Sequence, residues 1–146
     1  MKNFFKLILL YILSISCSGS QNNIKQYSIE TLMSNNRSSG GYFSKDANKL
    51  IYSSNKSGIF NIYEVDLKTY EETQITDSEE ESFFVRGYSP ITGEVIYSAD
   101  IGGNENSHIY IIRDGKSIDL TPGKNTKASF FGWTNNELEM YVISNS

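Results

Sequence analysis

A repeat of 45 residues organises this sequence. The stretch from Phe43 to Tyr63, FSKDANKLIYSSNKSGIFNIY, is written again with variations from Tyr88 to Tyr110, YSPITGEVIYSADIGGNENSHIY. A third copy begins at Trp133, so the first aromatic residues of the copies stand at positions 43, 88 and 133. A period of about 40 to 45 residues is typical of one four-stranded propeller blade. The sequence therefore predicts an all-β fold of successive antiparallel blades.

Short apolar runs separated by turn residues predict the strands of each blade. Leu50, Ile51 and Tyr52 are consecutive apolar residues, as expected for a strand covered on both faces, and we expect them, with Tyr63, to meet the next blade. Asp114-Gly115 is a strong signal for a two-residue hairpin. The strands expected from these patterns are Gly41–Phe43, Lys49–Ser54, Ile59–Leu67, Glu72–Thr76, Ser82–Arg86, Glu94–Ala99, His108–Arg113, Lys116–Leu120, Ala128–Phe131 and Leu138–Ile143.

The repeat stops partway through its third copy. We expect a propeller fragment over residues 42–146, with blades at 42–77 and 82–122 and an incomplete blade at 128–146. Propellers protect their strand edges by closing a ring of four to eight blades. Two and a half blades would leave an open edge at Tyr141 to Ile143 and an uncovered face on the first blade. The sequence is therefore expected to be a fragment of a longer propeller.

The first 17 residues have the pattern of an export signal. Lys2 and Lys6 form a short positive region, an apolar run follows from Leu7 to Ile15, and small residues come next. The apolar run is shorter than the roughly 20 residues that cross a bilayer as a helix. Cys17, the single cysteine, stands just after this run and resembles the lipid-acceptor cysteine of a bacterial lipoprotein. A conventional signal peptide cut nearby is the alternative.

Residues 18–41 are rich in Ser, Asn, Gln and Gly, a composition typical of a flexible tether. The segment from Tyr27 to Met33 interrupts it with apolar residues. We expect this segment to dock on the folded body, either as a strand or as one helical turn, because periodicity over so few residues does not distinguish the two.

Charge and cysteine content exclude several kinds of partner. Thirteen basic and seventeen acidic residues give a formal charge of −4, without a basic cluster after the first six positions. Nucleic-acid binding usually requires such a cluster and is not expected. A single cysteine allows neither an intrachain disulfide nor a thiolate metal site. The acidic run Asp77–Ser82 lacks the ligand pattern of a calcium loop and is expected to be solvated. No metal or cofactor site is expected.

Other conspicuous residues are expected to be structural. His108, the single histidine, aligns with Asn61 of the first copy, and no partner for a Ser-His-Asp triad accompanies it. Gly102 and Gly103 are expected to let a long loop turn without strain, because no helix follows them. Tyr88 and Trp133 occupy the position of Phe43 and are expected to pack between blades.

The repeat resembles the propeller blades shared by TolB-like proteins and by the prolyl oligopeptidase family of serine peptidases. Those blades centre on a turn written FSPDG, which Phe43 to Ala47 and Tyr88 to Thr92 keep in part. Three further stretches look like landmarks of secreted acylaminoacyl- and dipeptidyl-peptidase-like members, in the same order: Tyr97 to Glu105, Asp119 to Gly123 and Phe130 to Trp133. The resemblance covers roughly Tyr27 to Ser146.

The peptidase resemblance implies a noncatalytic segment of an exported serine peptidase. In that family the propeller caps an α/β-hydrolase domain and restricts peptide substrates by size, so a hydrolase domain is expected downstream in the full protein. The catalytic residues belong to that domain, and the 146 residues contain no Gly-x-Ser-x-Gly elbow. No catalytic residue is therefore expected in this chain. The alternative is a TolB-like propeller that serves as a protein-binding scaffold. Both place the protein in the periplasm or cell envelope, with a lipid anchor if Cys17 is modified.

Overall fold

The computed structural model describes residues 25–145, and the chain divides after Asn35 into two units. In the first unit, α2 (Ile29–Met33) is a short helix, so the apolar segment after Tyr27 takes the helical alternative. The Ser28 hydroxyl caps this helix by accepting a hydrogen bond from the Thr31 N–H at 3.2 Å. The expected signal peptide, with Cys17, lies outside the described residues. No helix within residues 25–145 is long and apolar enough to cross a membrane.

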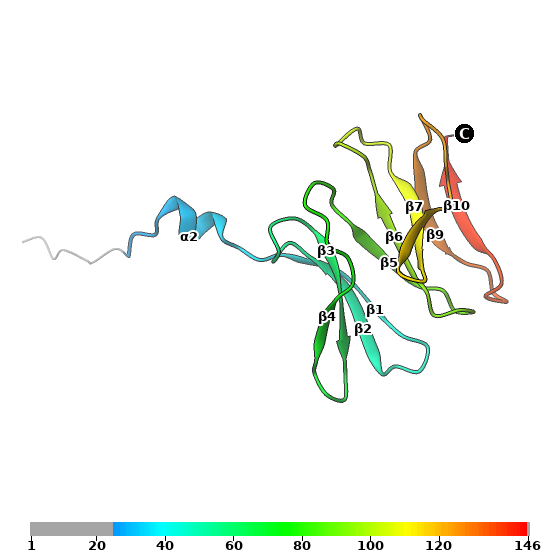
Figure 1. Cartoon of the computed structure of the whole chain (residues 1–146), viewed down its shortest axis with the longest axis horizontal. Helices are drawn as coiled ribbons and strands as arrows, with labels where there is room; N and C mark the ends of the chain where they lie inside the picture. Colours follow the sequence, from blue (N-terminus) through cyan, green and yellow to red (C-terminus); the bar gives the residue numbers. More distant parts are fainter. Residues whose placement is uncertain (1–24, 146) are drawn as a thin grey trace, which may run out of the picture. The chain divides into compact units, whose positions relative to one another are not determined.

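The second unit consists of antiparallel sheets in which sequential strands pair with each other (Figure 1). Blade 1 has the order β1-β2-β3-β4, blade 2 has the order β5-β6-β7-β8, and the third unit pairs β9 with β10. The strands are β1 (Ser38–Phe43), β2 (Lys49–Ser54), β3 (Asn61–Asp66), β4 (Glu72–Gln74), β5 (Phe84–Tyr88), β6 (Val95–Ala99), β7 (His108–Arg113), β8 (Lys116–Asp119), β9 (Ala128–Trp133) and β10 (Met140–Ser144). This arrangement confirms the all-β prediction, with two four-stranded blades and two strands of a third.

The 45-residue repeat is visible in the backbone. In each copy the turn after the first strand closes with a hydrogen bond between equivalent residues, and the N–H to oxygen distances are similar. The three bonds run from Ser44 N to Lys49 O (2.9 Å), from Ser89 N to Glu94 O (2.7 Å) and from Thr134 N to Glu139 O (2.8 Å). The copies detected in the sequence are therefore copies of one structural unit.

Most strands have a boundary that differs from the sequence-based expectation by one or two residues, and the first strands of the blades differ most clearly. Strand β1 begins at Ser38, inside the stretch expected to be tether, because Ser38 and Ser39 pair with Ser54 and Ser53 of β2. Backbone pairing needs no apolar side chain, so this extension has no hydrophobic signal. Strand β5 extends to Tyr88 instead of ending at Arg86, so the aromatic residue of the repeat closes the first strand of its blade.

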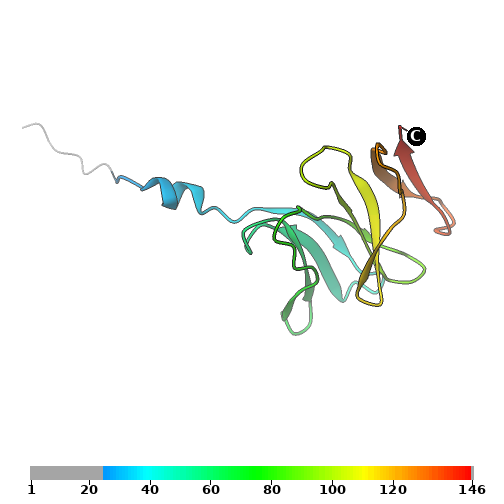
Figure 2. The same ribbon diagram turned by 45° about the horizontal axis from the view of Figure 1, so that its top comes forward.

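The hydrophobic core lies between the sheets rather than inside any one of them. Ile51 and Ile62 of blade 1 form one buried cluster with Val85, Val95 and Tyr97 of blade 2. A second cluster joins Ile96, Ile109 and Ile111 of blade 2 to Ala128 of β9, with Phe130, Trp133 and Val142 packed against it. Blade 2 therefore lies between blade 1 and the third unit, as Figure 2 shows from a second direction.

The structure corrects one expectation about blade 1. Successive side chains of a strand point to opposite faces of the sheet. Ile51 is fully buried in the cluster shared with blade 2, whereas Leu50 and Tyr52 lie on the other face with Tyr63, which pairs with Tyr52. The prediction that all four residues meet the next blade is therefore wrong for Leu50, Tyr52 and Tyr63.

An ion pair on blade 2 leads to a prediction about acid stability. Arg113 donates to both carboxylate oxygens of Glu94, at 2.6 and 3.1 Å, and Thr92 donates to the same group at 2.6 Å. These bonds lower the pKa of Glu94 from 4.5 to about 2. A carboxyl with a depressed folded-state pKa stabilises the fold above its unfolded-state value and loses that contribution as the pH falls through the folded-state value. The contribution of Glu94 is therefore expected to disappear between pH 4.5 and about 2.

Arg113→Gln is expected to raise the pKa of Glu94 towards 4.5 and to flatten the acid dependence of unfolding in this window. NMR titration of the Glu94 carboxyl measures the first effect, and urea unfolding at a series of pH values measures the second. Lys116→Gln removes the same charge from exposed Lys116 in the same hairpin and is the matched control. Equal shifts of the Glu94 pKa in the two variants would show that net charge, not the contact with Arg113, sets this pKa.

Candidate binding site

A cavity of about 660 Å³ lies where the equivalent turns of the three units approach one another. Its lining comes from residues 43–46 and 88–93, from the side chains of Lys49 and Glu64, and from Glu137 in the turn between β9 and β10. Because these turns are equivalent in the repeat, they lie at the same end of their blades. Side chains far apart in the sequence are thereby gathered around one cavity.

Lys45 joins the three turns. Its ammonium donates to the Pro90 carbonyl oxygen at 3.3 Å and to the Glu137 carboxylate at 3.1 Å. The side chains of Lys45 and Glu137 are 74% and 54% exposed. An ion pair this exposed contributes at most about 1 kcal/mol to stability. Another carboxylate can therefore replace Glu137 beside Lys45 at little cost to the fold.

The first turn is held rigidly by its own side chains. The Ser44 hydroxyl donates to Asp46 Oδ1 at 2.6 Å, and the Asn48 backbone N–H donates to the same oxygen at 3.1 Å. These contacts with Ser44 and Asn48 lower the pKa of Asp46 to about 2. Asp46 is thus ionised and engaged in the turn at neutral pH, which leaves Lys45 as the group of this turn that reaches across the cavity.

Tyr88 and Lys49 meet at Glu64 on the blade 1 side of the cavity. The Tyr88 hydroxyl donates to Glu64 Oε2 at 2.8 Å, and the Lys49 ammonium donates to Glu64 Oε1 at 2.7 Å. Burial, and then the hydrogen bond to Glu64, raise the pKa of Tyr88. Tyr88 is therefore neutral and acts as a hydrogen-bond donor that ties blade 2 to blade 1.

The lining of the cavity combines hydroxyl, charged and apolar side chains. Its hydroxyl groups include those of Ser44 and Ser89, and its carboxylates are those of Asp46, Glu64 and Glu137. The cavity also offers exposed apolar surface at Phe43 and Ile91, together with the Lys45 ammonium. Apolar surface with a few placed polar groups is the usual composition of a ligand site.

His108, singled out in the sequence, lies away from this cavity at the start of β7. It is 9% exposed, and its Nδ1 lies 2.7 Å from Asp119 Oδ2 on β8. Its ring lies 6.3 Å from that of Tyr110, in a stacked orientation. Across residues 25–145, no group of three or more His, Cys, Asp or Glu side chains is placed to hold a metal ion.

The remaining sequence candidates have structural contacts. Tyr88 and Trp133 pack against the first and second core clusters, as expected from their equivalence to Phe43. Gly102 and Gly103 have φ angles of +62° and +67°, which glycine adopts without strain. The Gly102 N–H donates to the carboxylate of Glu81 at 2.9 and 3.0 Å. The acidic run is thus tied to the long loop at Glu81, while Glu79 and Glu80 are exposed.

One buried polar network was not predicted. Asn61 is fully buried at the start of β3. Its side chain forms hydrogen bonds with the backbone of Ser78 and with the hydroxyl of Thr76. These bonds connect the end of blade 1 to its third strand. The hydroxyl of Thr76 accepts from Ile62 N at 2.9 Å, and Thr121, 45 positions later, accepts from Ile109 N at 3.0 Å. Thr76 and Thr121 are separated by the period of the repeat, and this spacing was the sequence signal that could have indicated their equivalent roles.

Stacked four-stranded antiparallel blades with a cavity at their turn ends define this protein as part of a β-propeller. No protein family matches the chain, and no curated protein matches it. Among solved structures, it is similar to TolB from Acinetobacter baumannii, with 24% identity and a TM-score of 0.47. That match covers 58% of this chain and 21% of TolB, so the chain spans about a fifth of its length.

Proposed function

We propose that this chain is a noncatalytic propeller segment that binds a polypeptide partner at the turn-lined cavity and so acts as a protein-binding scaffold in the cell envelope. The observation that carries the proposal is the Lys45–Glu137 contact, an exposed pair held at 3.1 Å between the first and third turns. A partner carboxylate can take the place of Glu137 on Lys45, while Phe43 and Ile91 provide apolar contacts beside it. Such a pairing of a cation with apolar surface fits an extended acidic peptide.

Photo-crosslinking tests the proposed binding site. A photoreactive phenylalanine analogue at Ile91, which is 59% exposed and lines the cavity, is expected to form adducts with a polypeptide in bacteria that export the chain. The same analogue at Tyr70, which is 80% exposed and outside the cavity lining, is the matched control. Lys45→Gln is expected to lower the adduct yield up to about fivefold, because an exposed ion pair contributes at most about 1 kcal/mol. Equal adducts from both positions, or none from Ile91, would contradict binding at the cavity.

The envelope location rests on the export-signal pattern, and lipidation of Cys17 is proposed as its anchor. Cells fed labelled palmitate are expected to label the wild-type chain and to leave Cys17→Ser unlabelled. Ser16→Ala, next to the acceptor, is the control and is expected to keep the label. Label that survives Cys17→Ser would assign the lipid to another residue or exclude this anchor.

A second hypothesis follows from the resemblance to the prolyl oligopeptidase family. It proposes that this propeller caps a hydrolase domain further along the same polypeptide. Its support is the resemblance of three sequence stretches, Tyr97 to Glu105, Asp119 to Gly123 and Phe130 to Trp133, to members of that family. The scaffold hypothesis and the peptidase-cap hypothesis differ in which other domain they require in the same polypeptide. A Gly-x-Ser-x-Gly elbow followed by Asp and His would support the peptidase cap, whereas further blades without a hydrolase domain would exclude it.

A further inference from the structure

A second cavity, of about 370 Å³, lies at the other end of blade 2. It is lined by the end of β6 and by the loop that follows, and Figure 1 shows this loop at the opposite end of blade 2 from the turn between β5 and β6. The two cavities share no lining residue. We call the second one the loop cavity, and four charged side chains line it: Arg86, Asp100, Glu105 and Lys127.

Arg86 lines the loop cavity from a β-bulge. It lies between the paired residues Val85 and Gly87 and is itself left out of the ladder between β5 and β6. A bulge releases its extra residue from the ladder and re-aims the side chain of that residue. Arg86 Nε donates to the hydroxyl of Ser98, a buried residue, at 3.0 Å. This bond orients the guanidinium and leaves its two terminal nitrogens available to bind a carboxylate.

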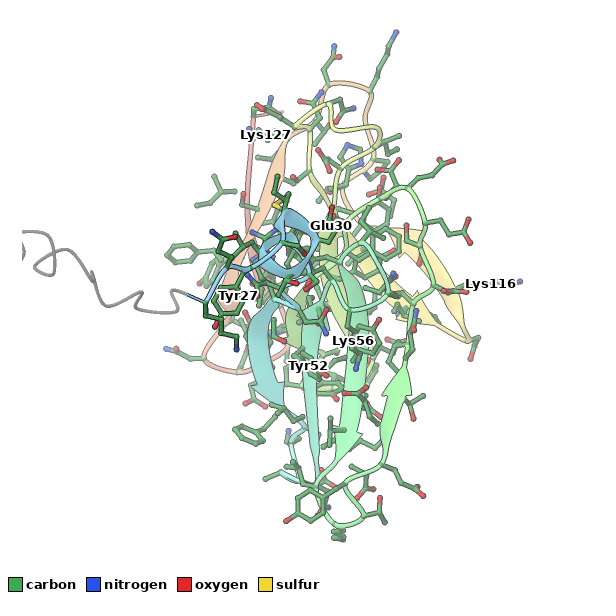
Figure 3. All side chains as sticks on the ribbon, turned by 90° about the vertical axis from the view of Figure 1, so that its left-hand side faces the viewer. Tyr27, Glu30, Tyr52, Lys56, Lys116 and Lys127 are labelled. Atoms are coloured by element: carbon green, nitrogen blue, oxygen red, sulfur yellow. The ribbon has the colours of Figure 1, made fainter. Side chains whose placement is uncertain are left out.

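The charges of the loop cavity do not neutralise one another by direct contact. Within residues 25–145, none of the four charged side chains is a member of an ion pair. Asp100 Oδ2 accepts a hydrogen bond from Glu105 N at 3.1 Å, which holds the loop and leaves the other carboxylate oxygen for a ligand. Lys127, labelled in Figure 3, stands just before β9 and brings the second cation from the third unit. Two cations and two carboxylates therefore line one cavity.

The repeat indicates that the blade fold does not require these charges. Three of the four charged residues have uncharged equivalents one period earlier: Gly41 for Arg86, Asn55 for Asp100 and Ser82 for Lys127. The equivalent of Ser98 is Ser53, whose hydroxyl accepts from Val85 N at 2.8 Å and so connects blade 1 to blade 2. In the second copy the same hydroxyl holds Arg86 instead. The charged set therefore belongs to the loop cavity and is not a feature of every blade.

We propose that the loop cavity binds a free α-amino acid. The carboxylate of the amino acid pairs with Arg86 and Lys127, and its ammonium pairs with Asp100 and Glu105, so the one ligand supplies a partner of opposite charge to every charged group of the lining. A volume of about 370 Å³ is near the lower end of the range for ligand sites, as a ligand of this size requires. Phe84 lines the same cavity and offers apolar contact to the side chain of the amino acid.

NMR titration of the isotope-labelled whole chain with each of the common free α-amino acids tests this site. At least one amino acid is expected to shift the amide signals of Asp100, Glu105 and Lys127 in a saturable manner, without shifting those of the turn at residues 89–93. For that amino acid, the deaminated acid and the decarboxylated amine with the same side chain serve as matched probes. Each is expected to bind about fivefold more weakly, because each lacks one of the two charged groups.

Variants that introduce the residues of the first copy assign the two charges of the ligand to their partners. Lys127→Ser and Arg86→Gly are expected to weaken binding of the amino acid and of the deaminated acid, and to leave binding of the amine unchanged. Asp100→Asn is expected to weaken binding of the amino acid and of the amine, and to leave binding of the acid unchanged. Lys116→Gln removes a charge from an exposed lysine outside the lining and is expected to leave all three affinities unchanged.

The absence of saturable shifts at these residues with every amino acid would overturn the proposal. Equal affinities for an amino acid and its deaminated acid would define a plain anion site and would also contradict it. So would affinities that change in none of the three variants. All these outcomes are independent of the proposed peptide site, because the two cavities share no lining residue.

Discussion

Asn61→Ala is expected to lower the free energy of unfolding by about 3 kcal/mol. The Asn61 side chain is fully buried and donates to the Ser78 carbonyl oxygen at 2.9 Å and to Ser57 Oγ at 3.1 Å. Its Oδ1 accepts from Ser78 N at 2.8 Å and from the Thr76 hydroxyl at 3.0 Å. Alanine removes these four hydrogen bonds together at a fully buried position, where water replaces them poorly.

Urea unfolding measures this loss, and Asn104→Ala is the control. Asn104 is exposed in the long loop and accepts a hydrogen bond from Asn106 N, so its loss is expected to cost less than about 1 kcal/mol. Equal losses for the two variants would mean that the bonds of Asn61 do not hold the end of blade 1 against its third strand.

Tyr97→Ala is expected to be the most damaging single substitution considered, with a loss of about 4 kcal/mol. The Tyr97 side chain is 2% exposed in the cluster between blades 1 and 2. Its ring centre lies 5.1 Å from that of Tyr110, in a stacked arrangement, and 5.0 Å from that of Phe83. Truncation removes both contacts and leaves a cavity at the interface of the blades.

Tyr97→Phe separates the ring from the hydroxyl. The hydroxyl contacts Ser117 Oγ at 2.7 Å, and its removal is expected to cost about 1 kcal/mol. Tyr70→Ala, at a position 80% exposed, is expected to change stability by less than about 0.5 kcal/mol. A loss for Tyr97→Phe as large as that for Tyr97→Ala would show that the hydroxyl, rather than ring packing, stabilises the interface.

The strands and turns were predictable because their signals are local. The aromatic residues at positions 43, 88 and 133 and the apolar runs after them indicate the strands directly. The Asp114-Gly115 hairpin is confirmed, with φ of +50° and +71° at its two residues, as a two-residue turn of this type requires. Repetition strengthened each local signal, because a weak pattern in one copy could be checked against its equivalents.

The face of the sheet on which each side chain lies was harder to predict. Leu50, Ile51 and Tyr52 form an unbroken apolar run, so alternation does not show which residues point to which neighbour. Only the packing of blade 2 against Ile51 separates the two faces. Asn61 was hard to predict for another reason, because two of its four hydrogen bonds run to the backbone of Ser78, which no side-chain pattern marks.

The binding cavity could not be predicted from any single segment. Its defining contact joins Lys45 to Glu137, which are 92 positions apart and are not equivalent in the repeat. That contact depends on how far each blade is rotated from the one before it, a quantity set by core packing rather than by strand propensity. The equivalence of the three turns in the repeat does not give the distance between them.

The face-to-face packing of successive blades is tested most directly by NOE measurements on methyl-labelled protein in solution. Cross-peaks are predicted from the methyl groups of Ile51 and Ile62 to Val85, Val95 and the Tyr97 ring, and from Ile96 and Ile109 to Ala128. These pairs lie in different sheets, so no isolated hairpin produces them. Cross-peaks confined to residues within one sheet, or from Leu50 rather than Ile51 to blade 2, would contradict the propeller arrangement.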